Sequence, residues 1–87
     1  MNTAYEILYK KSVDKDLRKL PANIRRQIVN KIQALSTSPH PHGSTKLRGS
    51  NDLYRIRYAD YRIIYQIKDS QLTILVIKVG HRKEIYR

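Results

Sequence analysis

The sequence predicts an α+β fold with the element order β-α-α-β-β-β, in which a helical hairpin packs on one face of a four-stranded, mainly antiparallel sheet. Two observations support this prediction. Polar and apolar residues alternate along segments of the C-terminal half, which is the period of a half-buried strand. Between residues 12 and 35, apolar residues instead recur at helical spacing. The chain, residues 1–87, is expected to form a single domain, because 87 residues supply one modest core.

The N-terminal part predicts one strand and two helices. A short strand is expected over residues 4–9, where tyrosine and isoleucine share one parity. The first helix is expected to start near Ser12, and Pro21 separates it from the second, which Pro21 itself opens. The second helix carries an apolar stripe made by Ile24, Ile28, Val29, Ile32 and Leu35.

The C-terminal half predicts three consecutive strands. They follow a loop-rich region over residues 36–50, which two prolines and Gly43 exclude from regular helix. The strands are expected over residues 53–58, 61–68 and 71–79. The last is apolar at both parities, which predicts a covered position between the strand at 61–68 and the N-terminal strand. The packed face is expected to carry Tyr54, Ile56, Ile63, Tyr65, Ile74 and Val76.

Charge is the strongest compositional signal, since 18 lysines and arginines against 7 acids give a net charge of +11. A small domain this basic usually binds a polyanion, such as nucleic acid or an acidic protein. The absence of cysteine excludes disulfides and thiolate metal sites. No apolar run approaches the length of a membrane span, and no signal peptide is visible. We therefore expect a cytoplasmic chain with no membrane partner.

Arginines occupy one parity of the strand predicted over residues 53–58. Arg55 and Arg57 alternate with apolar side chains, and a two-residue turn at 59–60 sets Arg57 opposite Arg62. Two like charges about 6 Å apart repel by roughly 0.7 kcal/mol in bulk water, so this arrangement destabilises a hairpin. A bound anion would remove the repulsion. The alternative is a solvated edge strand whose charges prevent pairing between sheets.

Four segments carry a resemblance to a known family: KLRG at 46–49, LYRIR at 53–57, DYRIIY at 60–65 and VGHRKEIY at 79–86. With the element order, they resemble the RelE branch of the RelE/ParE toxins of bacterial type II toxin–antitoxin systems. The resemblance implies a ribosome-dependent mRNA endonuclease that enters the A site of the 30S subunit and cuts the codon there. The ribose 2′-hydroxyl attacks the adjacent phosphate and leaves a 2′,3′-cyclic phosphate, with no metal and no other cofactor.

The same resemblance implies partners and site residues. The partners are mRNA, rRNA and a cognate acidic antitoxin, whose hetero-oligomer with the toxin binds operator DNA. Matched positions imply catalytic roles for Arg55, Arg57, Arg62, Arg82 and Tyr86. Substrate binding is expected of Lys46, Arg48 and His81. Better-known members carry lysines at the positions of Arg55 and Arg57 and continue into a C-terminal helix that is expected to be absent here.

The general base stays open at the level of the sequence. Arginine has a pKa above about 12, so it is a poor base at neutral pH. Arg57 therefore acts by electrostatics and positioning, or else His81, whose ordinary pKa lies near 6.5, supplies acid or base catalysis. His40 and His42 form a His-x-His pair without nearby cysteine or acid, which indicates a loop tip rather than a metal site.

Two other functions remain compatible with the sequence. One is a ParE-like inhibitor of DNA gyrase without nuclease activity, which would not require the arginine face or a C-terminal tyrosine. The other is a non-catalytic module that binds nucleic acid or a protein partner. Mapping mRNA 5′ ends after induction distinguishes these functions.

Overall fold

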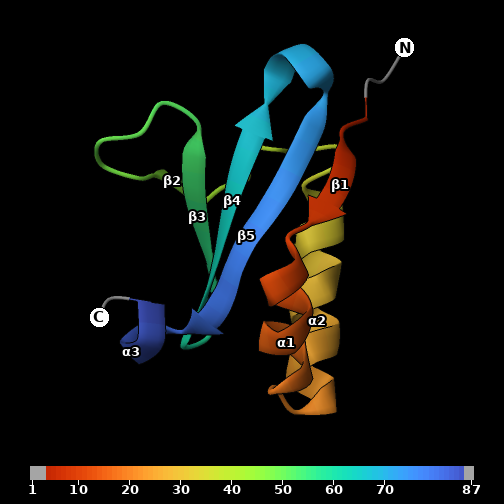
Figure 1. Cartoon of the computed structure of the whole chain (residues 1–87), viewed down its shortest axis with the longest axis vertical. Coiled ribbons are helices and arrows are strands. Elements are labelled where there is room, and N and C mark those ends of the chain that lie inside the picture. The colour runs from red at the N-terminus through yellow and green to blue at the C-terminus, as the bar shows by residue number, and fades with distance from the viewer. Residues whose placement is uncertain (1–3, 86–87) are drawn as a thin grey trace.

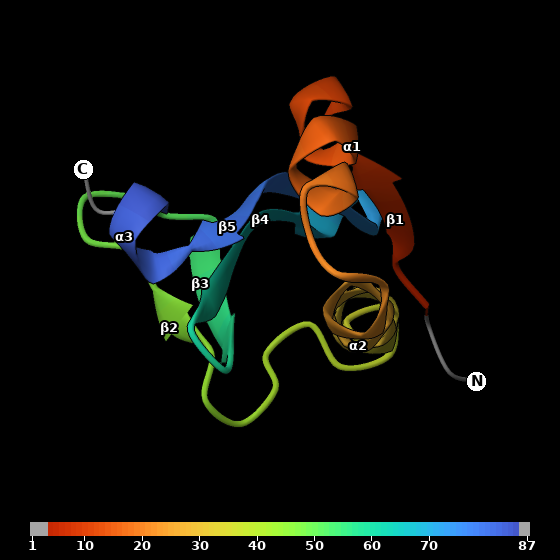
Figure 2. The ribbon, with the colours of Figure 1, turned by 90° about the horizontal axis from the view of Figure 1, so that it is seen from below.

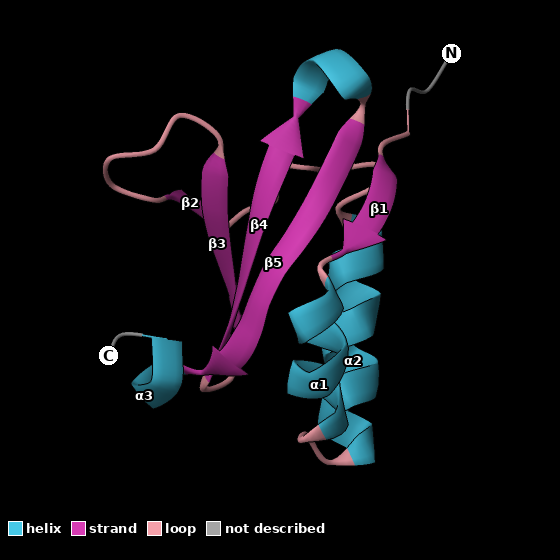
Figure 3. Cartoon of the chain, viewed as in Figure 1, coloured by secondary structure: helices cyan, strands magenta, loops and turns pink. Residues whose placement is uncertain are grey.

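A computed structural model describes the backbone of residues 4–85 and the side chains of residues 4–83. The elements in chain order are β1 (Glu6–Tyr9), α1 (Lys11–Arg18), α2 (Ala22–Ala34), β2 (Thr45–Lys46), β3 (Leu53–Tyr58), β4 (Tyr61–Lys68), the 3-10 turn η1 (Asp69–Gln71), β5 (Thr73–His81) and α3 (Arg82–Ile85). Helices α1 and α2 stand together on one side of the molecule, and the sheet fans out from them (Figures 1 and 3). None of the described helices combines the length and apolar composition needed to cross a membrane.

The sheet has five strands in the order β1-β5-β4-β3-β2. Strand β1 runs parallel to β5 and the other pairs are antiparallel, so the sheet is mixed, and β5 lies between β1 and β4 as predicted. The prediction of four strands was wrong, because β2 adds a fifth at the β3 edge through the pairs Thr45–Arg55 and Lys46–Tyr54. A strand of two residues is too short to show a period of its own.

One hydrophobic core holds the helices on the sheet. Helices and their ends contribute Val13, Ile28, Ile32 and Leu35, and the sheet contributes Ile56, Ile63, Tyr65, Ile67, Ile74, Val76 and Val79. Every member is at most 4% exposed. Five of the six residues predicted for the packed face are in this core, and the sixth, Tyr54, is half-buried and packs against it. Both helices therefore serve a single core, as the helical hairpin prediction requires.

A β-bulge changes which side chains of β5 face the core. Ile64 pairs with Lys78 but Tyr65 pairs with Val76, so one extra residue, Ile77, sits in β5. A bulge of this kind shifts the side-chain alternation of the strand by one residue. Val79 consequently joins the core face, on which Val76 also lies, and the sequence pattern alone did not indicate this switch.

The C-terminal region differs from the expectation in three ways. Strand β5 runs two residues further than predicted, to His81. The turn before β5 is a 3-10 turn closed by Leu72 in the left-handed conformation, with φ 50°, rather than a two-residue turn. A one-turn helix, α3, follows β5 directly, where no element was expected. Its first backbone N–H, that of Arg82, donates to the Asp60 carbonyl at 2.8 Å, which ties α3 to the β3–β4 turn.

Helix α1 protects the part of the β5 edge that β1 leaves uncovered. The β1–β5 pairing ends at Tyr9 and Val76, and α1 continues alongside the remainder of β5 (Figure 1). There the Asp16 carboxylate accepts the Val79 backbone N–H at 3.2 Å and lies 3.7 Å from the Lys78 ammonium. Asp16 thereby satisfies a backbone donor just beyond the bulge, which an uncovered edge would leave to water.

Replacing Asp16 by alanine is expected to lower the free energy of unfolding by about 1–3 kcal/mol, because a backbone donor loses a charged acceptor. Asp14→Ala is the matched control on the same helix, because Asp14 pairs only with the exposed Arg18 in the described part of the chain. Its loss should be below about 1 kcal/mol. Urea unfolding of both variants measures the difference, and equal losses would contradict the role given to Asp16.

Tyr65 anchors the loop between α2 and β2. Its side chain is fully buried, and its hydroxyl donates to the Pro39 carbonyl at 2.9 Å. The ring also stacks on Tyr54 with centroids 6.0 Å apart. Burial raises the pKa of Tyr65 from 10.0 to about 12, because the phenolate would lose its hydration inside the core. The protonated form is therefore the one that the folded state accommodates.

The stability of the protein is expected to fall as the pH rises from about 10 to about 12. In that window the unfolded chain releases the Tyr65 proton while the folded chain retains it, so unfolding is favoured. Tyr65→Phe should remove this contribution and, at neutral pH, lower the unfolding free energy by about 0.5–1.5 kcal/mol through the lost hydrogen bond. Urea unfolding of both proteins at pH 7 and across this window tests the two effects. An unchanged alkaline profile in Tyr65→Phe would show that other groups dominate it.

Candidate active site on the outer face of the sheet

The outer face of the sheet, opposite the core, carries two cross-strand rows. One row joins Arg57 on β3, Arg62 on β4 and Gly80 on β5, and the next joins Arg55, Ile64 and Lys78. We call these six residues the arginine face. The predicted pairing of Arg57 with Arg62 is confirmed by the strand register. Directly opposed residues hold their Cβ atoms about 4.5–5.5 Å apart, so both guanidinium groups rise from neighbouring points of the sheet.

Backbone carbonyls near the β3–β4 turn orient both guanidinium groups. Arg57 Nε donates to the Ala59 carbonyl at 3.0 Å, and Arg62 Nη1 donates to the Tyr61 carbonyl at 3.3 Å. Each bond uses one of the five donors of a guanidinium group. The salt bridges among the described residues join Arg18 to Asp14 and Lys78, in the next row of the arginine face, to Asp16 of α1; neither involves Arg57 or Arg62. This row therefore presents two positive charges beside each other on an accessible face.

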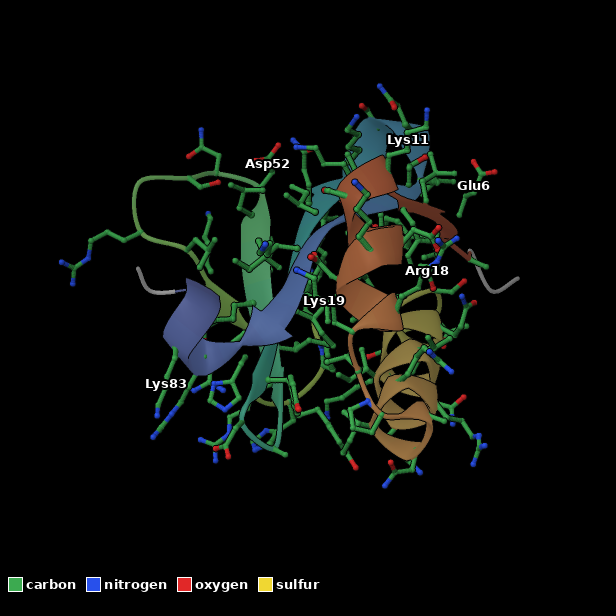
Figure 4. All side chains as sticks on the ribbon, turned by 60° about the horizontal axis from the view of Figure 1, so that its bottom comes forward. Glu6, Lys11, Arg18, Lys19, Asp52 and Lys83 are labelled. Carbon is green, nitrogen blue, oxygen red and sulfur yellow. The ribbon has the colours of Figure 1, made fainter. Side chains whose placement is uncertain are left out.

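The end of β5 brings Arg82 to the same end of the sheet. Gly80 is opposite Arg62, and the Arg82 backbone bond to the Asp60 carbonyl places α3 against the β3–β4 turn. Helix α3 and helix α2 lie on opposite sides of the ribbon formed by β4 and β5 (Figure 2). The exposed Lys83 of α3 extends away from the sheet (Figure 4). Tyr86, the remaining predicted catalytic residue, lies outside the described residues.

His81 does not join the arginine face. Its strand partner is Tyr61, and the two rings meet edge to face with centroids 5.6 Å apart. Tyr61 has the parity of the core residue Ile63, so the register assigns His81 to the helix side of the sheet. There it borders a cavity of about 250 Å³ that is also lined by Asp16 of α1. The His81 Nδ1 atom accepts the backbone N–H of Lys83 at 3.3 Å.

Lys46 and Arg48 lie at the β2 edge of the sheet, and both are exposed. Lys46 pairs with Tyr54, which packs on the core, so the register directs it to the side opposite Arg55. Arg48 follows in the loop between β2 and β3. The structure therefore groups Arg57, Arg62 and the start of α3, sets Arg55 one row away, and leaves Lys46 and Arg48 at the margin.

Two positions of the arginine face were missed in the sequence. Lys78 pairs with Ile64 only because of the bulge at Ile77, which reverses the parity that simple alternation assigns to it. Gly80 is opposite Arg62, has no side chain and is buried. The segment VGH at 79–81 was noted in the sequence and contains Gly80, whereas no local pattern indicated the position of Lys78.

Comparison with known proteins settles the family. The family model described as "ParE toxin of type II toxin-antitoxin system, parDE" matches residues 7–86. The chain is also 36% identical over 87 residues to the mRNA interferase toxin RelE of Escherichia coli K12, covering 95% of this chain and 90% of that protein. The chain belongs to the RelE branch of the RelE/ParE toxin family. Toxin RelG of Mycobacterium tuberculosis is 31% identical, with 95% and 97% of the two chains covered.

Solved structures of RelE toxins share the fold. The isolated E. coli RelE toxin superposes with a TM-score of 0.79 at 34% identity, covering 95% of this chain and 92% of that chain. The RelE of the archaeal RelE–RelB complex from Pyrococcus horikoshii OT3 superposes with a TM-score of 0.81 at 32% identity, covering 91% and 96%. The RelE-like α+β fold expected from the sequence is thus confirmed, with the fifth strand as the correction.

Residues suited to a resident metal do not gather in the described part of the chain. No group of three or more His, Asp or Glu side chains could hold an ion among those residues. The two members of the His-x-His pair have different surroundings. His40 packs edge to face on Tyr54 with centroids 4.9 Å apart, whereas His42 borders a cavity next to Arg57.

Proposed function

We propose that this chain is the toxin of a type II toxin–antitoxin system and acts in the cytoplasm as a ribosome-dependent mRNA endonuclease. The observation that carries the proposal is the direct pairing of Arg57 with Arg62 on an accessible sheet face, with α3 tied to the same end of the sheet. Two opposed like charges cost stability unless an anion binds them. The similarity to the E. coli mRNA interferase toxin RelE supports mRNA as this anion. In this proposal the chain binds the mRNA backbone in the 30S A site.

The proposed reaction moves a phosphoryl group within one RNA strand, from the 5′-oxygen of one nucleotide to the 2′-oxygen of the nucleotide before it. The ribose 2′-oxygen forms a bond to phosphorus, the bond from phosphorus to the 5′-oxygen breaks, and a 2′,3′-cyclic phosphate remains. The 2′-hydroxyl loses its proton and the leaving 5′-oxygen gains one. Negative charge grows on the non-bridging oxygens, where Arg57 and Arg62 donate forked hydrogen bonds. Arg55 supports them from the next row, and Arg82 lies towards the leaving oxygen.

The arginine face acts mainly by electrostatics and positioning in this proposal. Arginine stays protonated at neutral pH, so neither Arg57 nor Arg62 removes the proton from the 2′-hydroxyl. His81 packs on Tyr61 and follows the parity of the core face, which supports the electrostatic alternative over histidine base catalysis. The ribosome supplies the in-line geometry, and water accepts the proton. Tyr86 keeps its proposed role of stacking on an unpaired base.

Exposed basic residues around the site are proposed to hold the RNA backbone. Lys46 and Arg48 at the β2 edge contact phosphates without reading sequence, while other basic residues of the +11 chain meet rRNA. These contacts predict an affinity for ribosomes that falls steeply with salt.

A cognate acidic antitoxin is the proposed protein partner. Relatives with this fold have been solved as complexes of RelE with RelB, from E. coli and from Pyrococcus horikoshii. A net charge of +11 favours an acidic partner, whose binding neutralises the toxin. Operator DNA is reached only through this hetero-oligomer.

The experiment that tests the function is induction of the chain in growing cells, followed by mapping of mRNA 5′ ends. Cuts inside translated codons, absent before induction, support the nuclease. The ParE description of the matching family model keeps gyrase inhibition as the second candidate. Intact mRNA with a DNA-damage response would establish that candidate instead, and the absence of any growth defect would favour a non-catalytic binding module.

A further inference from the structure

A cavity of about 410 Å³ opens on the helix side of the β3 edge, between the C-terminal half of α2, the loop after it and the end of β3. Its volume is in the range of pockets that hold small ligands, about 300–1,000 Å³. Arg57 is the residue that borders the cavity and also belongs to the arginine face on the other side of β3.

The loop before β2 creates this cavity. Strand β2 pairs only with Tyr54 and Arg55, so the outer edge of β3 is uncovered from Ile56 onward. Gly43, at φ +93°, turns the chain away from that edge, and the Ser44 backbone N–H bonds back to the Pro41 carbonyl at 3.0 Å. Any residue with a side chain would be strained in the left-handed conformation that Gly43 adopts. The space between the loop and the strand edge thus follows from the backbone geometry.

The chemistry of the lining fits a flat, negatively charged ligand. The nearly buried side chains of Leu35 and Ile56 line the apolar part of the cavity. Lys31, His42 and Arg57 supply the polar part, and the described residues that line the cavity include no carboxylate. An unstacked nucleobase has an apolar surface that stacks on histidine or arginine planes, and the phosphates beside it seek cations.

We propose that this cavity receives the base of a nucleotide flanking the scissile phosphate, with His42 as the residue that recognises it. The proposal rests on the proposed nuclease function and adds the place where cut-site preference arises. Arg57 links recognition of the base to cleavage of the phosphate, since it belongs to both the cavity and the arginine face. Lys31 neutralises the phosphate of the captured nucleotide. In this proposal His40 of the His-x-His motif packs on Tyr54, and His42 recognises the base.

The test compares the sequences around many mRNA cut sites in cells that express the wild-type chain, His42→Ala or Lys31→Ala. We expect the wild type to prefer particular bases at one position next to the cut, and His42→Ala to reduce this preference by about tenfold, the typical worth of one base stack. Lys31→Ala should reduce cleavage at all sites alike. His40→Ala and the exposed Arg26→Ala are the matched controls, and both should keep the wild-type preference.

Three outcomes would overturn the proposal. If the wild type showed no base preference next to the cut, the cavity would not recognise a base. The same preference in His42→Ala as in the wild type would exclude His42. A His42→Ala variant that loses affinity for the antitoxin but keeps its cut-site preference would make the cavity a protein-binding site. A wild-type chain that cuts no mRNA would refute the nuclease function itself, which is a distinct result.

Binding measured in solution provides a second readout that does not need cleavage. A trinucleotide with 2′-O-methyl groups lacks the attacking hydroxyl, so it can be titrated into the purified wild-type chain without being cut. We expect the imidazole NMR signals of His42 to shift while those of His40 stay in place. Movement of the arginine signals with no response at His42 would contradict the proposal.

Discussion

Replacing Arg62 by alanine is expected to reduce mRNA cleavage by about 10²–10³-fold, the usual cost of removing one preorganised donor from a developing oxyanion. Arg62 is opposite Arg57 and holds its guanidinium group against the Tyr61 carbonyl, so it is oriented before the substrate binds. Its removal takes away half of the paired charge on this row. Cleavage of a defined mRNA on purified ribosomes measures the loss.

The same substitution should leave the fold intact or stabilise it slightly. Arg57 and Arg62 repel one another in the free protein by an amount on the order of 0.7 kcal/mol in water, and alanine relieves this repulsion. A purely structural arginine would behave in the opposite way, losing stability and activity together. Arg62→Lys is expected to recover part of the activity, because lysine keeps the charge but not the forked geometry.

Controls separate charge from position in this experiment. Arg26→Ala removes an equal charge from the exposed surface of α2 and should cost little activity at moderate salt. Unchanged cleavage in Arg62→Ala would remove the arginine face from the mechanism. A His81→Ala variant that loses as much activity as Arg62→Ala would favour the histidine alternative despite its contact with Tyr61.

Replacing Ile63 by alanine is expected to lower the free energy of unfolding by about 2–5 kcal/mol. Ile63 has no exposed surface and lies between Ile56 and Val79 in the register, so truncation leaves a cavity in the middle of the sheet. A small domain is stable by only about 5–15 kcal/mol, so this loss is a large fraction of the total. Urea unfolding gives the value directly.

A matched surface substitution makes this prediction specific to the core. Leu8 on β1 is 45% exposed, and Leu8→Ala should change stability by at most about 0.5 kcal/mol. Comparable losses in the two variants would mean that Ile63 is not packed as the structure describes. Because Ile63 directly follows Arg62 along β4, this core position also keeps the arginine face in register.

The sequence predicted those positions of the site that depend only on residues close to one another along the chain. Alternation over residues 53–58 separated the arginines from the core side chains, and a two-residue turn required Arg57 to meet Arg62. Lys78 and His81 could not be placed in this way. The bulge at Ile77 changes the parity of β5, and it arises from the pairing of β5 with β4.

The sequence by itself determined the faces of β3 and β4, the helical stripes and the excess of positive charge, because each depends on residues within one or two turns or on composition alone. Only the tertiary structure decided the fifth strand, the orientation of His81 and the cavity beside Arg57. These features arise where segments far apart in the chain meet, and their free energies depend on contacts that no local period encodes.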